Sequence, residues 1–70
     1  MKNINIFGDN VQSYESLAIR AARMWKKRGY NVSDISISDV NGCVTFSLLD
    51  ARGGIDSVIS LEGKRLKFAW

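Results

Sequence analysis

The sequence predicts an α+β fold in which one amphipathic helix packs on one face of a curled, mainly antiparallel sheet, in the order β-α-β-β-β-β. Three observations predict it: a short alternating segment near the start, one stretch with helical periodicity, and two hairpin turns after it. The 70 residues are expected to form a single compact domain, 1–70. A chain of this size buries only about 60% of its unfolded surface. Its 46% hydrophobic residues still allow a two-layer core and argue against disorder.

The first strand is expected over Asn3 to Phe7, where Ile4 and Ile6 alternate with two asparagines. A period of two is typical of a strand with one buried face. The sequence leaves open where this strand joins the sheet. It could lie antiparallel beside the second strand, or it could add at the far edge.

A helix is predicted from Asp9 to about Arg28. Asp9 would cap its start in a capping box with Gln12, and Ser13 is the alternative start. Gly29 suits the left-handed position that follows a last helical turn. At about 100° per residue, the apolar side chains form one stripe. Its members are Tyr14, Leu17, Ala18, Ala21, Met24 and Trp25.

Two hairpin turns organise the remaining residues. Asn41 and Gly42 are the strongest short hairpin signal and predict a two-residue loop. The resulting register places apolar pairs on one face and hydroxyl pairs on the other, which supports it. The pairs are Ile37 with Phe46, Ile35 with Leu48, Ser38 with Thr45 and Ser36 with Ser47. A second loop at Glu62 and Gly63 would pair Ile59 with Leu66, Ser57 with Phe68 and Ile55 with Trp70.

Only the predicted helix can cover one face of this sheet. The core is expected to contain Ile4, Ile6, Leu17, Ala21, Trp25, Ile35, Ile37, Phe46, Leu48, Ile59, Leu66 and Phe68. The order of elements resembles the cystatin-type arrangement, in which a sheet curls around one helix. The resemblance is one of topology, without a protease-inhibiting loop motif, so it implies a fold and no function.

The residue types argue against an enzyme. The chain has no His, and its single Cys43 has no predicted base nearby. Its aspartates are scattered over strand ends and turns, so we expect no metal site and no cofactor. No stretch approaches the roughly 20 apolar residues of a membrane span. With no signal peptide and one lone cysteine, we expect a cytoplasmic protein that does not bind membranes.

The charges are sorted along the chain. Residues 1–30 carry six Lys or Arg and two Asp or Glu, residues 31–63 carry one and five, and residues 64–70 carry three and none. The net charge of +3 therefore hides two basic blocks around an acidic middle. Such blocks can attract nucleic acid or an acidic protein, or they can be ordinary solvated surface.

The candidate partner-binding residues are cations of the two blocks: Arg20, Arg23, Lys26, Lys27, Arg65 and Lys67. The first four fall on the outward face of the predicted helix, where they also complement its dipole. The last two fall on the sheet face away from the helix, because alternation points Phe68 and Trp70 to the helix side. The two sets are thus expected on opposite sides, without a continuous stripe for nucleic acid.

These features lead us to expect a small non-enzymatic binding protein that docks on an acidic surface of another protein. In style it is like the accessory or inhibitory proteins of phages and mobile elements. The alternative is a nucleic-acid-binding module that uses the basic helix face. A homodimer through the open, Ser/Thr-rich sheet face or through an edge strand is compatible with both.

Overall fold

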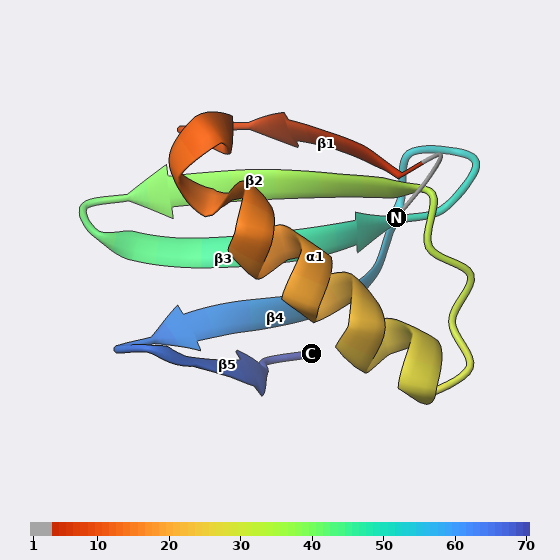
Figure 1. The fold of residues 1–70 in the computed structure, drawn as a ribbon. Helices are drawn as coiled ribbons and strands as arrows, with labels where there is room; N and C mark the ends of the chain where they lie inside the picture. The colour runs from red at the N-terminus through yellow and green to blue at the C-terminus, as the bar shows by residue number, and fades with distance from the viewer. Residues whose placement is uncertain (1–3) are drawn as a thin grey trace.

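The computed structural model describes residues 4–70 and shows one helix packed on one face of a five-stranded mixed sheet (Figure 1). The elements are β1 (Asn5–Gly8), α1 (Val11–Lys27), β2 (Asp34–Val40), β3 (Cys43–Leu49), β4 (Ile55–Glu62) and β5 (Arg65–Phe68). This confirms the predicted α+β class and the order of elements. The predicted strand start at Asn3 and the charge of Lys2 lie outside the described residues. No helix in the described range is long and apolar enough to cross a membrane.

The strands lie side by side in chain order, and β1 pairs with β2 in parallel, while every other neighbouring pair is antiparallel. The first strand thus lies beside the second, which is one of the two places that the sequence left open, but the expected antiparallel orientation is wrong. The helix runs back along the sheet, so β2 starts from the same end as β1, as in a β-α-β crossover. Gly8 permits the close approach: its φ is +117°, and a Cβ there would collide with the carbonyl oxygen of Ile37.

The helix begins differently from the prediction. Its N-cap is Asn10, which has a φ of 51° and makes no side-chain capping bond, so neither Asp9 nor Ser13 caps the helix. The Asp9 carboxylate instead accepts a hydrogen bond from the backbone N–H of Asp39, at 2.9 Å. It therefore ties the helix start to the end of β2. At the other end Gly29 has a φ of +92°, as expected for the residue after the last turn.

The first hairpin has the predicted register in full, from Val40 opposite Cys43 to Ile35 opposite Leu48. The second hairpin does not. Its loop is Gly63 and Lys64, and its pairs are Ile59 with Phe68, Ser60 with Lys67, Leu61 with Leu66 and Glu62 with Arg65. The predicted loop would have placed Glu62 at the position that needs a positive φ, whereas Gly63 takes it, at +65°. The shift is two residues, so these side chains keep their faces.

Two β-bulges modify the sheet. In the pairing of β3 with β4, Leu48 lies opposite Ser57 but Leu49 lies opposite Ile55, which leaves Asp56 as the extra residue. After β5, Val58 exchanges both backbone hydrogen bonds with Trp70, and its carbonyl also accepts the N–H of Ala69. Ala69 is thus an extra residue in that strand. The predicted pairing of Ile55 with Trp70 is wrong for two reasons: the shifted register would place Trp70 opposite Ser57, and the bulge then places it opposite Val58.

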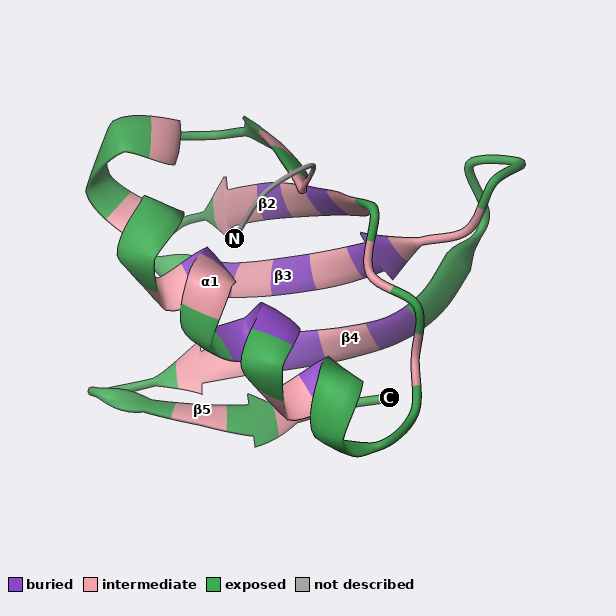
Figure 2. Cartoon of the chain, turned by 45° about the vertical axis from the view of Figure 1, so that its right-hand side comes forward, coloured by how far each residue is buried: buried purple, intermediate pink, exposed green. Residues whose placement is uncertain are grey.

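The core lies between α1 and the central strands, where the buried segments of Figure 2 face each other. Every predicted core residue is buried or partly buried in one cluster. Further residues that the prediction did not include are also buried: Ala18, Ala22, Val44 and Ser57. Trp25 is the largest fully buried side chain, and its indole Nε1 has no hydrogen-bond partner within the described chain.

Candidate protein-binding surfaces

The sheet face away from α1, here called the open face, has no element of the described chain packed on it (Figure 2). The buried residues Ile35, Phe46 and Ile59 point to the helix, so the residues that alternate with them point outward. Cross-strand pairing places five of these side chains in one central row, since residues directly opposite share a face. The row consists of Phe7, Ser36, Ser47, Val58 and Trp70.

The large hydrophobic side chains that are exposed in residues 4–70 all belong to this open face. They are Phe7 (39% exposed), Ile55 (48%), Val40 (60%) and Trp70 (70%). Phe7 and Trp70 end the central row, Ile55 lies opposite Leu49, and Val40 lies opposite Cys43. The four residues share this face but are spread over it, since Phe7 and Trp70 lie at opposite edges of the sheet and Val40 and Ile55 lie at opposite ends of β3. Because these exposed apolar residues lie on one face, that face is the candidate contact surface.

The two bulges decide that Ile55 and Trp70 are on the open face. Simple alternation predicts both on the helix side, and each extra residue reverses that assignment. The backbone of Trp70 is held in place, because its carbonyl accepts the hydroxyl of the buried Ser57 at 2.7 Å. Its ring is consequently exposed on a fixed backbone. Nothing in the local sequence marks Asp56 or Ala69 as extra residues, so sequence reasoning missed this part of the site.

The predicted basic residues occupy two places. Arg20, Arg23 and Lys27 are exposed on α1, and their side chains make no hydrogen bond or ion pair with other residues in the described part of the chain. Lys26 is exposed as well and lies with Lys27 in the last helical turn, where cations complement the helix dipole.

Arg65 and Lys67 are exposed on β5 and lie opposite Glu62 and Ser60, on the side of the open face. The structure thus does not bring them together with the helix cations. The C-terminal end of α1 nevertheless reaches β5: the Arg28 guanidinium carbon lies 3.6 Å from the centre of the Phe68 ring.

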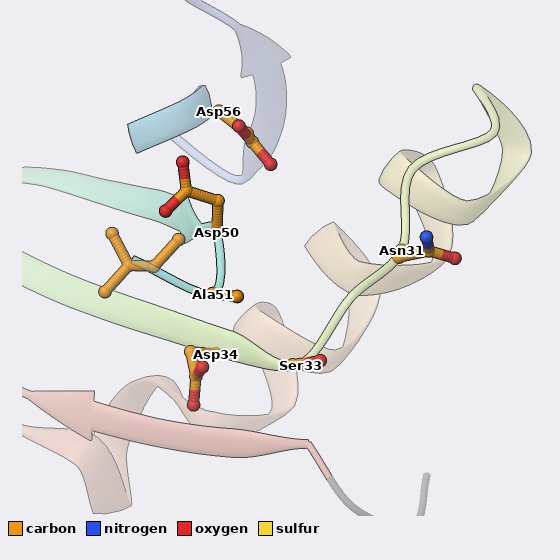
Figure 3. Close-up of a pocket in the computed structure, with 7 residues that line it drawn as sticks. Asn31, Ser33, Asp34, Asp50, Ala51 and Asp56 are labelled. Carbon is orange, nitrogen blue, oxygen red and sulfur yellow. The ribbon is translucent and has the colours of Figure 1, made fainter. Parts of the chain in front are cut away.

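An acidic hollow of about 380 Å³ lies near the start of β2 (Figure 3). Its carboxylates are Asp34, Asp50 and Asp56. Asp50 accepts hydrogen bonds from the backbone N–H groups of Arg52 and Gly54, both at 2.8 Å, so it organises the loop between β3 and β4. Within residues 4–70 no group of His, Cys, Asp or Glu side chains is arranged to hold a metal ion. Turn hydrogen bonds therefore account for the position of Asp50, and the Asp34 carboxylate accepts a hydrogen bond from the Asn5 side-chain amide at 3.3 Å.

A second carboxylate cluster joins the start of α1 to the end of β2. The Asp39 carboxylate accepts hydrogen bonds from the Tyr14 hydroxyl at 3.3 Å and from the Asn10 side-chain amide at 3.2 Å. Partial burial, and then the adjacent Asp39 carboxylate, raise the pKa of Tyr14. Both effects favour the neutral phenol. The cluster thus reads as a structural tie between two elements.

Comparisons with known proteins identify no relative of this chain. It matches no family model, and neither a similar curated protein nor a similar solved structure was found.

Proposed function

We propose that this chain is a small non-enzymatic binding protein that docks on another protein through the open face. The observation that carries this proposal is that the exposed large apolar side chains of residues 4–70, namely Phe7, Val40, Ile55 and Trp70, all lie on that face. Exposed apolar side chains gain free energy when a partner removes them from water, by about 25 cal/mol per Å². An accessory or inhibitory role, of the kind found among phage and mobile-element proteins, is part of the proposal.

The chemistry of the open face fits the anatomy of a protein interface. Its central row contains serine hydroxyls between two aromatic rings and no charge. Interface cores are likewise poor in charged residues and enriched in aromatic ones. Trp70 is the expected anchor, since tryptophan dominates measured binding energies. Arg65 and Lys67 border the same face, so the partner is expected to present acidic groups at the matching border.

A capture experiment tests this proposal. The wild-type chain is used to capture partners from lysate, with and without nuclease treatment, and compared with Trp70→Ser and Ile55→Ser variants. We expect a protein that is captured with and without nuclease and lost with either variant. Glu15→Ser, an exposed change on the helix, is the control and should capture normally. Capture that is unaffected by both open-face variants would remove the open face as the contact surface.

A second copy of this chain is the simplest alternative occupant of the open face. Sedimentation equilibrium of the wild type and of Trp70→Ser over a range of concentrations distinguishes it. A dimer that is lost in the variant would identify the partner as the chain itself. A monomer at every concentration would exclude it.

The unpaired cations on α1 favour nucleic acid binding as a second candidate function. Arg20, Arg23 and Lys27 project from one outward helix surface without carboxylate partners in the described chain. Phosphate contacts of this kind weaken with salt by about one unit of log–log slope per contact. We expect this function to show retention on nucleic acid that falls steeply with salt and disappears when Arg20 and Arg23 are both changed to Glu. Lack of retention at about 50 mM salt would exclude it.

A further inference from the structure

The outer edge of β5 has unpaired backbone groups. β5 is the last strand in the sheet order and pairs with β4 on one side. Its two-residue loop makes Glu62 and Arg65 the closing pair, and backbone bonding alternates along an antiparallel ladder. Arg65 and Lys67 therefore bond to β4, while the N–H and C=O groups of Leu66 and Phe68 point away from it. No backbone group elsewhere in the described range bonds to these outward groups.

The same edge has a hollow and a positive charge. A depression of about 310 Å³ is lined by Glu62, Arg65, Leu66 and Lys67. The side chains of Arg65 and Lys67 are exposed, and they form no ion pair with residues in the described chain. On the helix side of the edge, Arg28 lies over the Phe68 ring. A partner segment along this edge would thus have Arg65 and Lys67 on its open-face side and Arg28 on its helix side.

We propose that β5 binds an extended acidic segment of a partner protein, which adds to the sheet as a further strand. Backbone hydrogen bonds to Leu66 and Phe68 would supply the pairing, as in other strand-addition complexes. Because side chains of the added strand alternate, those on the open-face side would meet Arg65 and Lys67. Those on the helix side would meet Leu66 and Phe68. The preferred segment accordingly alternates acidic and apolar residues.

Charge also selects against self-pairing at this edge. Two copies joined through β5 in antiparallel fashion would bring Arg65 and Lys67 of each chain opposite those of the other. Like charges directly opposite each other destabilise a strand pair. Lysine on an edge strand is a common protection against such pairing. The same cations that oppose a second copy attract an acidic strand.

A synthetic peptide in which glutamate alternates with valine is the probe. We expect it to bind and to slow hydrogen exchange of the Leu66 and Phe68 amides by about tenfold or more at saturation, measured by NMR. Changing Arg65 and Lys67 together to Glu should raise the Kd about tenfold or more. The control is Arg52→Glu, which reverses one charge on the exposed loop between β3 and β4, and it is compared with the single variant Arg65→Glu. We expect Arg52→Glu to alter the Kd less than about threefold and Arg65→Glu to raise it more than that.

A second peptide of the same composition, with its glutamates and valines in separate blocks, tests the alternation and should bind at least about tenfold more weakly. Three results would overturn the proposal: equal binding of the two peptides, equal weakening by Arg65→Glu and Arg52→Glu, or unchanged exchange at Leu66 and Phe68. Tighter binding of a single-stranded oligonucleotide that slows the same amides would overturn it in favour of nucleic acid.

This inference rests on the protein-binding role proposed above, although it uses a different surface. The two can fail separately. Lysate capture that depends on Trp70, without binding of the alternating peptide, would leave the open-face proposal intact and remove strand addition. Peptide binding at β5, with capture that does not depend on Trp70 or Ile55, would do the reverse.

Discussion

Trp25 and Trp70 have opposite surroundings, and both are informative about this molecule. Trp25 is a residue of α1 whose side chain is completely buried in the core, and its indole N–H has no partner in the described chain. Trp70 is 70% exposed, although its backbone is bonded to Val58 and Ser57. A buried N–H without a partner costs about 1–3 kcal/mol. The buried apolar ring of Trp25 therefore stabilises the core, and its unpaired N–H offsets part of that stabilisation.

Replacing Trp25 by Phe should therefore cost little for a change at the centre of the core. The smaller ring loses packing, but the unpaired N–H is removed as well, so we expect a loss of no more than about 1.5 kcal/mol. Trp25→Ala should cost about 3–5 kcal/mol, because nothing offsets its cavity. Urea unfolding measures both, with Trp70→Phe as an exposed control within about 0.5 kcal/mol. Equal losses of stability for Trp25→Phe and Trp25→Ala would contradict this account of the Trp25 ring and its unpaired N–H.

The Tyr14 hydroxyl should give this protein an alkaline pH dependence. Burial and Asp39 raise the pKa of Tyr14 in the folded state, so its contribution is complete below the ordinary tyrosine pKa. It is lost as the pH rises through the raised folded pKa. Tyr14→Phe should thus lower the urea midpoint at neutral pH, and the difference from wild type should shrink in alkali. Asp39→Asn should lower the Tyr14 pKa measured by NMR, and an unchanged value would argue against the contact.

At the scale of elements, the turn residues predicted the strand register that depends on the conformation of the turn itself. The register of β2 with β3 follows from Asn41 and Gly42, because both loop residues adopt the positive φ that this turn needs. The observed register of β4 with β5 differs from the predicted one by two residues, because Glu62 stays in its strand and Gly63 starts the loop. The bulges had no such signal, since an extra residue such as Asp56 is specified only by pairing with another strand.

The parallel pairing of β1 should depend on Gly8. A Cβ at Gly8 would meet the Ile37 backbone, and the φ of +117° is unfavourable for other residues. We expect Gly8→Ala to lower the free energy of unfolding by more than about 2 kcal/mol and to increase amide exchange along β1. Gly29→Ala is the matched control, because Gly29 also has a positive φ but open space around it. It should cost about 1–2 kcal/mol, and an equal loss for Gly8→Ala would refute the steric account.

At the scale of the whole molecule, the two faces of the sheet differ. The helix covers one face, and the open face presents Phe7, Ile55 and Trp70 to solvent. The helix cations and the β5 cations face different sides, as the sequence suggested, yet Arg28 joins the helix end to β5. The molecule therefore offers an apolar face and a basic edge that meet at β5.

The two tryptophans provide a direct measurement of this separation. In a Trp25→Phe variant, the fluorescence that remains comes from exposed Trp70 and should be quenched efficiently by acrylamide. In a Trp70→Phe variant, it comes from buried Trp25 and should be protected, with a quenching constant several times smaller. A protected Trp70 in the folded monomer would mean that its ring does not lie free on the open face.

The sequence by itself determined the elements, the helix stripe, the apolar side of each regular strand and the identity of most core residues. These depend on periodicity and turn chemistry, which act over a few neighbouring residues. The tertiary structure decided the parallel place of β1, the bond from Asp39 to Asp9, and the two bulges that place Ile55 and Trp70 outward. Each of these depends on a residue of another element, and no turn signal in the sequence specifies it. The candidate site belongs to this second group, because its main apolar residue, Trp70, is turned outward by pairing alone.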